Sequence, residues 1–268
     1  MKYVPGAQAN NTKKELGQHW LNDLPALSAI VDAADVVDGD AVLEIGPGLG
    51  TLTDVLANRG AQVTALEFDQ DLLPKLEKKF KNTEHVKIEF GDVRTFDFRK
   101  MPKNYKVVAN IPYYLTSHLI RSMSESVNPP SLAVLLIQKE VAERICASPG
   151  QMGILSVTAQ FYFDCTLDIE VPAELFTPPP KVDSQVIVLK HRPAKLFDVE
   201  EKAYFHLVKA GFSEKRKTLR NALSGGLALD KPEIEKLLMS ANIKDSARAQ
   251  ELSLQQWFEL YKVYTAKP

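Results

Sequence analysis

The chain has 268 residues, of which 45 % are hydrophobic and 25 % are charged. This is the composition of a globular protein of one or two domains, and it excludes a disordered chain, a collagen-like chain and a disulfide-stapled miniprotein. The 33 Lys and Arg residues nearly balance the 34 Asp and Glu residues, and the net charge of −1 excludes a uniformly basic nucleic-acid coat protein but not a local basic face.

The two cysteines, Cys146 and Cys165, form no Cys-x-x-Cys pair and have no His at a metal-ligand spacing. They are therefore predicted to be buried apolar residues in a reducing compartment, with no disulfide framework and no metal site. No apolar run approaches the roughly 18 residues that a membrane helix needs, and the first residues lack the apolar segment of a secretory signal. We expect a cytoplasmic monomer with no membrane partner.

The N-terminal part of the chain predicts alternating helices and strands. In chain order these are a helix over 24–34, a strand over 41–46, a helix over 51–59, a strand over 63–68, a helix over 69–80, strands over 86–90 and 106–111, a helix over 115–126, a strand over 131–138 and a helix over 139–147. Such alternation indicates an α/β fold, a parallel sheet with helices on both faces. Ligands bind such sheets beyond the carboxyl ends of the strands.

The pattern changes after Gly153. A helix is predicted over 154–163 and strands over 165–171 and 182–190, separated by a fixed extended loop, Phe176–Ser184, that contains three consecutive prolines. The remainder predicts short helices at about 200–211, 214–224, 232–240, 246–249 and 253–264. We therefore expect an α/β domain over 1–192 and a small all-helical domain over 193–268.

A glycine-rich loop, Gly46-Pro47-Gly48-Leu49-Gly50, follows the first strand and opens a helix. Glycines allow the backbone to turn tightly and approach a ligand closely, although many sheets use such turns only for packing. The loop matches neither the dinucleotide pattern Gly-x-Gly-x-x-Gly nor the Walker pattern, which disfavours phosphate binding.

Two acidic residues stand at the ends of the next two strands. Glu67 could accept hydrogen bonds from a ribose diol, and Asp92 could accept one from an adenine amino group. Considered alone, Glu67 could be a surface carboxylate and Asp92 could be a helix cap or turn residue. Together with the glycine loop they predict a pocket for an adenosine without a phosphate tail, as in S-adenosylmethionine.

The segment Asn110-Ile111-Pro112-Tyr113 ends the fourth strand and has the form [Asn/Asp]-x-Pro-[Tyr/Phe] of amino-directed methyltransferases. An exocyclic adenine amine is a poor nucleophile because its lone pair is delocalised into the ring. The Asn110 side-chain oxygen and the Ile111 carbonyl could accept from this amine and aim its lone pair at a methyl sulfonium. Pro112 fixes the turn, Tyr113 offers a stacking face, and Phe176 could cover the other face of the base.

Two further segments are candidates. In Leu16–Asp23, His19 by itself is best explained as a core or capping residue. The stretch Lys209–Arg220 is basic, as is Arg94–Lys106. Charge runs are usually solvated faces, but two of them in a neutral protein favour a groove that follows nucleic-acid phosphates.

Taken in order, these motifs resemble the ribosomal RNA small-subunit adenine dimethyltransferases, and the resemblance extends from Leu16 to beyond Trp257. It is carried by the segments Leu16–Leu21, Glu44–Gly50, Gly91-Asp92, Asn110–Tyr113, Phe176–Ser184, Lys215–Asn221 and Glu251–Leu254. One departure is Trp20, where the family more often has Phe. The Asn-Ile-Pro-Tyr motif is shared with the erythromycin-resistance family, which methylates large-subunit rRNA.

The resemblance implies a Rossmann-like S-adenosylmethionine-dependent methyltransferase domain and a helical domain that recognises rRNA. It implies dimethylation of N6 in two adjacent adenines of the 3′-terminal hairpin loop of 16S rRNA, within the 30S subunit or its precursor, during late small-subunit biogenesis. Carried over by residue, the catalytic group is Asn110, Ile111, Pro112, Tyr113 and Phe176. Donor contacts fall on Gln18, His19, Leu21, Gly46, Gly48, Glu67, Asp92, Val93 and Asn110, and rRNA contacts on Lys215, Arg216, Lys217 and Arg220.

Three alternatives stay open at this point. The same pocket would suit a large-subunit rRNA methyltransferase of the erythromycin-resistance type or a DNA adenine methyltransferase. A non-catalytic ribosome assembly factor with a vestigial pocket is the third, because a fold does not guarantee activity.

Overall fold

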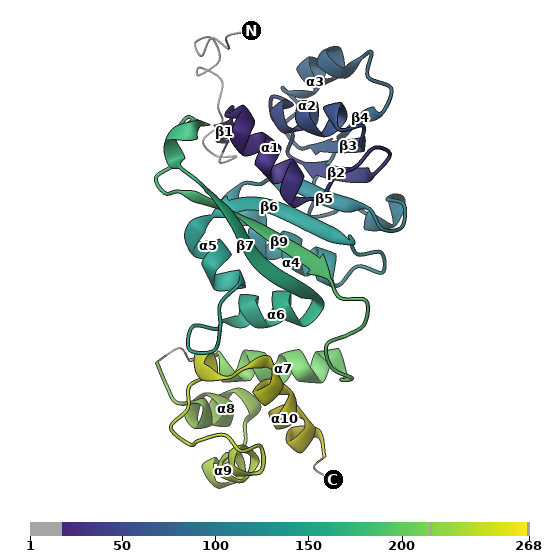
Figure 1. Ribbon diagram of the computed structural model, residues 1–268. Helices are drawn as coiled ribbons and strands as arrows, with labels where there is room; N and C mark the ends of the chain where they lie inside the picture. The colour runs from purple at the N-terminus through teal and green to yellow at the C-terminus, as the bar shows by residue number, and fades with distance from the viewer. Residues whose placement is uncertain (1–17, 215, 267–268) are drawn as a thin grey trace. The chain divides into compact units, whose positions relative to one another are not determined.

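The computed structural model describes residues 18–214 and 216–266, which form two compact units (Figure 1). The first contains the chain up to Ala142 together with Asp164–His191, and the second contains Glu143–Phe163 together with the chain from Arg192 onward. The expected domain division at residues 192 and 193 stays a prediction. It differs from this packing in residues 143–163, which pack with the C-terminal helices.

The first unit is built on a seven-stranded sheet in the order β4-β3-β2-β5-β6-β9-β7. Its strands are β2 (Ala41–Ile45), β3 (Gln62–Glu67), β4 (Val86–Phe90), β5 (Lys106–Asn110), β6 (Leu132–Gln138), β7 (Phe163–Val171) and β9 (Ser184–His191). Strands β2 to β6 pair in parallel, as predicted. The carboxyl ends of β2, β3, β4 and β5 consequently lie at one edge of the sheet.

The sheet is mixed rather than parallel throughout. β9 pairs antiparallel with β6, from Leu132 opposite Lys190 to Gln138 opposite Ser184. The regular alternation of strand and helix, which is the sequence signal for parallel pairing, ends before β7 and β9. Periodicity located both strands to within about two residues but carried no information about their direction.

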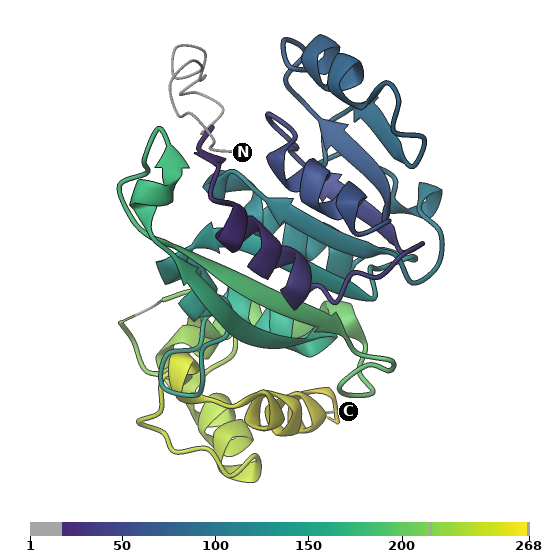
Figure 2. The same cartoon turned by 45° about the horizontal axis from the view of Figure 1, so that its top comes forward.

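Helices cover both faces of the sheet, as predicted. In Figures 1 and 2, α1 (Leu24–Ala33) lies in front of the strands and α4 (Thr116–Ser124) lies behind them. The other helices of this unit are α2 (Thr51–Asn58), α3 (Leu73–Phe80) and the start of α5 (Lys139–Ile145). Apolar residues of α1 and α2 form one buried core with the strands, so the position of the glycine loop between β2 and α2 is fixed by packing on both sides.

A short two-stranded sheet lies outside the main one. β1 (Trp20–Leu21) pairs antiparallel with β8 (Phe176–Thr177), so that Leu21 lies opposite Phe176. The Pro-rich segment was predicted to be a loop from Phe176 onward. In the structure its first two residues instead pair as a strand. This pairing joins the start of the described chain to the segment between β7 and β9.

The second unit is helical. Its helices are α6 (Ile154–Tyr162), α7 (Glu201–Gly211), α8 (Leu219–Leu227), α9 (Lys231–Ser240) and α10 (Leu254–Thr265), which pack around Tyr204 and Trp257. The helix expected from residue 214 begins only at Leu219, where Thr218 in an extended conformation is the N-cap. The helix expected over 246–249 is wrong, since the helical turn there is a 3-10 turn at Ala249–Glu251.

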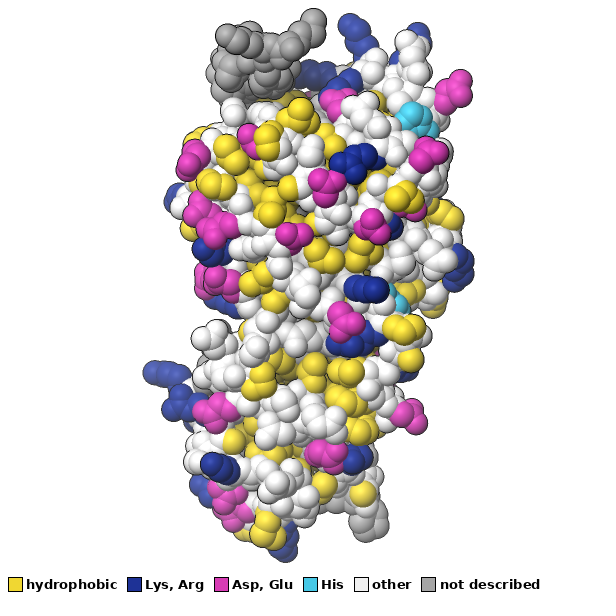
Figure 3. All heavy atoms as spheres, in the orientation of Figure 1, with side chains coloured by type: hydrophobic (Ala, Val, Ile, Leu, Met, Phe, Trp, Pro, Cys, Tyr) yellow, Lys and Arg dark blue, Asp and Glu magenta, His cyan; other side chains and the backbone are white. Residues whose placement is uncertain are grey.

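The surface carries both signs of charge. On the face drawn in Figure 3, acidic and basic side chains are interspersed rather than gathered by sign, in agreement with the near-zero net charge. Among the residues that the structure describes, no helix has the length and apolarity required to cross a membrane.

Candidate active site

A pocket opens at the edge of the sheet where the parallel strands end. It is lined by eleven of the residues that the sequence singled out: Gln18, His19, Gly46, Gly48, Glu67, Asp92, Val93, Asn110, Ile111, Pro112 and Phe176. The chain reaches this pocket from the glycine loop, from the ends of β3, β4 and β5, from the segment before β1 and from β8. The structure therefore brings together predicted donor and target residues that are far apart in the sequence. We call this cavity the main pocket.

The glycine loop requires glycine for two different reasons. Gly46, Gly48 and Gly50 all have positive φ, of 68°, 58° and 72°, which side-chain-bearing residues rarely adopt. A Cβ at Gly50 would lie 2.7 Å from Cε2 of Phe80, whereas a Cβ at Gly46 would meet nothing within 4 Å. Gly50 is thus required by packing, and Gly46 leaves space at the wall of the main pocket.

Glu67 is the buried carboxylate beneath this loop. Its Oε2 accepts from the backbone N–H of Gly48 at 3.1 Å, and its Oε1 accepts from the N–H of Asp69 at 2.7 Å. Burial raises the pKa of Glu67, and these backbone hydrogen bonds oppose that rise. The carboxylate is held rigidly at the end of β3 with both oxygens oriented, which suits an acceptor for a diol.

A second buried carboxyl group, Glu44, lies on the neighbouring strand and also lines the main pocket. It is 1 % exposed, and its Oε2 accepts from Oγ1 of Thr53 at 2.6 Å. Burial raises its pKa to about 8, and the charge of Glu67 contributes in the same direction. Burial therefore favours the protonated form of Glu44.

Asp92 is engaged by Arg94, two residues later. The Arg94 Nε lies 2.8 Å from Oδ2, and the Arg94 backbone N–H donates to Oδ1 at 2.9 Å. The hydrogen bonds from the Arg94 side chain hold the pKa of Asp92 below its usual value. Asp92 is therefore an ionised acceptor that already has a partner in the free protein.

Asn110 ends β5 with its side chain tied to the N-terminal segment. Its Nδ2 donates to the backbone oxygen of His19 at 3.2 Å. His19 itself is anchored, since its Nδ1 lies 2.7 Å from the backbone oxygen of Pro178. This hydrogen bond fixes the orientation of the amide, whose oxygen is the atom that can accept from a ligand.

The segment from Gln18 to Trp20 forms one wall of the main pocket. Gln18 Nε2 donates to Oδ2 of Asp69 at 2.8 Å, and Trp20 packs against the glycine loop, where a Cβ at Gly48 would lie 3.1 Å from the indole Cδ1. Leu21 is 1 % exposed and belongs to the core rather than to the pocket lining. Its expected donor contact stays a prediction.

The remaining predicted roles are not tested by this geometry. Phe176 lines the main pocket, but it is only 3 % exposed and also belongs to the core, so stacking on a base stays a prediction. The side chain of Tyr113 and the whole of Lys215 lie outside the described residues. Arg216 is exposed, Lys217 forms an ion pair with Glu214, and Arg220 Nη1 lies 2.6 Å from Glu235 Oε1.

The pocket residues that were not predicted as site residues from the sequence include Glu44, Phe68, Arg94 and Tyr114. Phe68 and Arg94 each stand next to or near a predicted acidic residue, so the rule that ligands lie beyond strand ends could have found them. Within residues 18–214 and 216–266, no group of three or more His, Cys, Asp or Glu is placed to hold a metal ion.

The sheet order, the glycine loop and the polar residues at the strand ends define a class. This is a Rossmann-like methyltransferase of the S-adenosylmethionine-dependent kind with an appended helical unit. In agreement, the structure is similar to a dimethyladenosine transferase from Plasmodium falciparum, with a TM-score of 0.77 and 26 % identity over 90 % of this chain and 96 % of that one. It is also similar to the 23S rRNA methyltransferase ErmE, with a TM-score of 0.74 and 27 % identity over 91 % of this chain and 98 % of that one.

The sequence comparison is more specific. Residues 9–266 match the model of the ribosomal RNA adenine dimethylase family. The ribosomal RNA small subunit methyltransferase A of Dehalococcoides mccartyi is 41 % identical over 260 residues, which are 96 % of this chain and 89 % of that protein. The chain therefore belongs to the ribosomal RNA adenine dimethylase family and is an enzyme of that family. Because its identity to the small-subunit relative is higher than to ErmE, the large-subunit alternative is not favoured.

Proposed function

We propose that this enzyme transfers methyl groups from S-adenosylmethionine to N6 of two adjacent adenines in the 3′-terminal hairpin loop of 16S rRNA. Its substrate is the 30S subunit or its precursor, and it acts late in small-subunit biogenesis in the cytoplasm, where ribosomes are assembled. The observation that carries the proposal is the position of Asn110 in the main pocket, with its amide nitrogen held by the oxygen of His19.

The residues present fit this methyl donor. Gly46 leaves open space for a ligand against the loop, and Glu67 presents fixed carboxylate oxygens to a ribose. Asp92 lies on the same wall as an acceptor for the adenine amine, next to the apolar side chain of Val93. Gln18 and His19 close the pocket from the N-terminal side. Once bound, the donor supplies an electrophilic methyl group on a sulfonium.

The target amine is oriented by Asn110 and Ile111. The Asn110 side-chain oxygen and the Ile111 carbonyl each accept one N6 hydrogen, which turns the nitrogen lone pair toward the methyl carbon. The N–C bond forms as the C–S bond breaks, the sulfur leaves as a neutral thioether, and the nitrogen then loses a proton to water. No covalent protein intermediate is required, because alignment of two bound reactants can lower a barrier by several kcal/mol.

The second methylation uses the same acceptors. A monomethylated amine keeps one hydrogen, so after rotation it can still donate to one of the two oxygens. We infer that donor exchange separates the two transfers, because the departing thioether blocks the position that the next methyl group must occupy.

The rRNA is contacted by the basic segment before and within the first turn of α8, formed by Lys215, Arg216, Lys217 and Arg220. Lys217 and Arg220 are paired with carboxylates in the free protein. Phosphates would compete for these cations, and this contribution to affinity should weaken as salt is raised.

Methyl transfer from labelled S-adenosylmethionine tests the proposal. Unmethylated 30S particles, 50S particles and duplex DNA are supplied separately, and the modified nucleotide is mapped. We expect label only in the 30S particles, at two adjacent adenines near the 3′ end of 16S rRNA. Label confined to 50S particles or DNA would support one of the alternative methyltransferases, and label in none would support a non-catalytic assembly factor.

The variant Asn110→Ala tests the mechanism separately. We expect it to bind the donor within an order of magnitude of the wild type and to lose methyl transfer, because the target-amine acceptor is removed while Glu67 and Asp92 are retained in the main pocket. Dimethylation that persists in this variant would remove the role assigned to Asn110.

A further inference from the structure

Both carboxylate oxygens of Asp92 are hydrogen-bonded by Arg94, through its side chain and its backbone N–H, in the free protein. Arg94 Nε lies 3.0 Å from Oδ1 and 2.8 Å from Oδ2, Nη2 bonds Oδ2, and the Arg94 backbone N–H donates to Oδ1 at 2.9 Å. A carboxylate offers about four lone-pair positions. Three N–H groups of Arg94, at its backbone N, Nε and Nη2, take most of these positions, with the single Nε hydrogen shared between the two oxygens. A further N–H that approaches Asp92 therefore competes with the hydrogen bonds from Arg94.

Arg94 also occupies an aromatic face of the main pocket. Its guanidinium carbon lies 5.9 Å from the centroid of the Phe68 ring, within the reach of a cation–π contact. Phe68, Asp92 and Arg94 all line the main pocket. Phe68 is 48 % exposed, so its ring is accessible from the pocket rim.

An adenine ring can bind the same two groups as this guanidinium, namely the Asp92 carboxylate and the face of the Phe68 ring. Adenine and guanidinium are both flat groups that stack on an aromatic face, and both donate N–H hydrogen bonds to a carboxylate. A guanidinium on Asp92 and Phe68 therefore stands where an adenine bonded to Asp92 would have to lie.

We propose that Arg94 occupies the adenine position of the free enzyme and is displaced when the donor binds. The inference rests on the proposed function, because it takes Asp92 as the acceptor for the donor's adenine. The side chains of the ion pair are 51 % and 22 % exposed, and exposed pairs are weak. Displacement of Arg94 therefore lowers donor affinity only about two- to fivefold.

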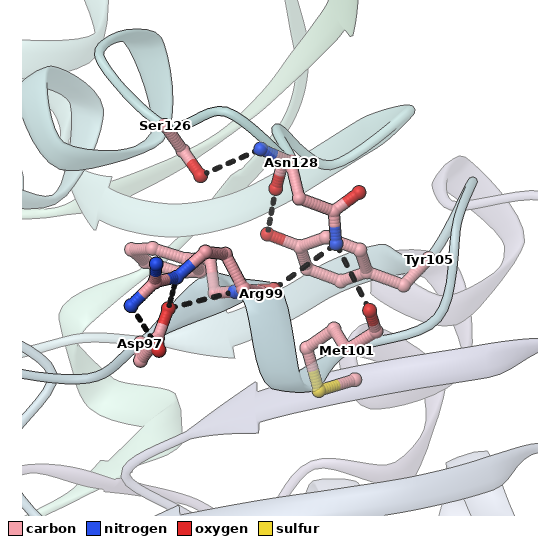
Figure 4. Close-up of polar contacts among 7 residues, drawn as sticks. Asp97, Arg99, Met101, Tyr105, Ser126 and Asn128 are labelled. Carbon is pink, nitrogen blue, oxygen red and sulfur yellow. Dashed lines mark hydrogen bonds and ion pairs between the residues drawn. The ribbon is translucent and has the colours of Figure 1, made fainter.

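The chain contains a matched control for this arrangement. Asp97 and Arg99 repeat the spacing of Asp92 and Arg94, with Arg99 N–H to Oδ1 at 3.0 Å, Nε to Oδ1 at 2.8 Å and Nη2 to Oδ2 at 2.9 Å (Figure 4). Neither residue of this second pair lines the main pocket. Removal of Arg99 thus deletes the same chemistry without opening the adenine position.

The test is calorimetric titration of the full-length wild type, Arg94→Met and Arg99→Met with S-adenosylhomocysteine, in the absence of RNA. Methionine keeps an unbranched apolar stem and removes the guanidinium with its N–H groups. We expect Arg94→Met to bind two to five times more tightly than the wild type and Arg99→Met to bind like the wild type. Thermal unfolding midpoints of both variants provide the folding control.

Salt provides a second readout. S-adenosylhomocysteine has no net charge at neutral pH, whereas the Arg94–Asp92 pair is exposed and is screened by salt. The difference between the wild type and Arg94→Met should therefore decrease as the salt concentration rises. A difference independent of salt would show that the gain does not arise from the ion pair.

The outcomes separate the two proposals. Binding by the wild type together with unchanged or weaker binding by Arg94→Met would overturn the competition and would indicate that Arg94 supports Asp92 in donor binding. An equal gain in Arg99→Met would also overturn it. Absence of binding by all three folded proteins would overturn the proposed donor, and the role of Arg94 with it.

Discussion

The side-chain amide of Asn110 donates to the backbone oxygen of His19, a residue 91 positions earlier in the chain. His19 is held in turn by the Pro178 carbonyl, in the segment that follows β8. Three distant segments thus determine which way one amide group faces. The orientation of the target-amine acceptor is consequently a property of the folded pocket rather than of the Asn-Ile-Pro-Tyr motif.

The contact between His19 and Pro178 predicts a kinetic effect. His19→Ala removes a hydrogen bond worth about 0.5–1.5 kcal/mol, so we expect kcat to fall roughly two- to tenfold through looser alignment of Asn110. His19→Asn retains a donor near the position of Nδ1 and should recover part of the loss. Steady-state kinetics on 30S particles measure both variants. If the KM for the donor changes more than kcat, His19 acts through the direct donor contact that the family resemblance implies.

Glu44 predicts a pH-dependent stability difference. The folded state raises its pKa from 4.5 to about 8, so between these pH values the folded chain keeps a proton that the unfolded chain releases. The free energy of unfolding therefore falls as pH rises through this window, by up to about 1.4 kcal/mol per pH unit from this group. Below pH 4.5 both states hold the proton and the contribution is constant.

Glu44→Gln removes this titration and keeps an acceptor for Thr53. We expect its stability relative to the wild type to increase from pH 5 to pH 8 by an amount on the order of a few kcal/mol, measured by urea unfolding without ligand. Glu77→Gln, at an exposed position on α3, is the control and should leave the pH profile unchanged. Parallel profiles for Glu44→Gln and the wild type would contradict the prediction.

Alanine variants of three glycines should have different effects on the stability of the fold and on ligand binding. Gly39, Gly46 and Gly50 all have positive φ, so Ala at each costs about 1–2 kcal/mol in backbone strain. Gly50→Ala also collides with Phe80, and we expect it to be the least stable of the three by urea unfolding. Gly46→Ala should match Gly39→Ala in stability but bind S-adenosylhomocysteine at least about tenfold more weakly, because its methyl group enters the main pocket. Equal binding by the last two variants would argue against a ligand at this wall.

The basic segment near α8 predicts a change in salt dependence. Replacement of Lys215, Arg216, Lys217 and Arg220 by Ala should reduce the slope of log affinity for 30S particles against log salt by up to about 3, because each lost phosphate contact contributes roughly 0.7–0.9. The matched control replaces the exposed lysines Lys75, Lys78 and Lys81 by Ala. A slope that is unchanged in the first variant, or reduced equally in the control, would count against this rRNA contact.

Replacement of Glu235 should change the affinity for 30S particles in the opposite direction. Its carboxylate pairs with Arg220 in the free protein, so Glu235→Gln frees the guanidinium for phosphate. We expect tighter binding to 30S particles at low salt, measured in the same titrations, and no gain when Arg220 is also replaced by Ala.

The local sequence determined the elements and the positions where chemistry could occur. Strands β2 to β6 were predictable because β-branched and apolar runs alternate with helical periodicity, and the regular order of strand and helix requires parallel pairing. Glu67, Asp92 and Asn110 could be placed in one pocket because the carboxyl ends of parallel strands meet at one edge of a sheet. These signals are local, and one sequence is sufficient to read them.

Tertiary structure alone decided how those residues are paired. The pairing of β1 with β8, the antiparallel direction of β9, and the contacts of Asn110 with His19 and of Glu44 with Thr53 join segments whose separation no periodicity encodes. The same holds for residues 143–163, which the sequence assigned to the domain over 1–192 but which pack with the C-terminal helices. The packing of the whole chain sets the partner and the burial of each side chain. Burial in turn raises the pKa of Glu44, and the contact with His19 orients the Asn110 oxygen toward a ligand.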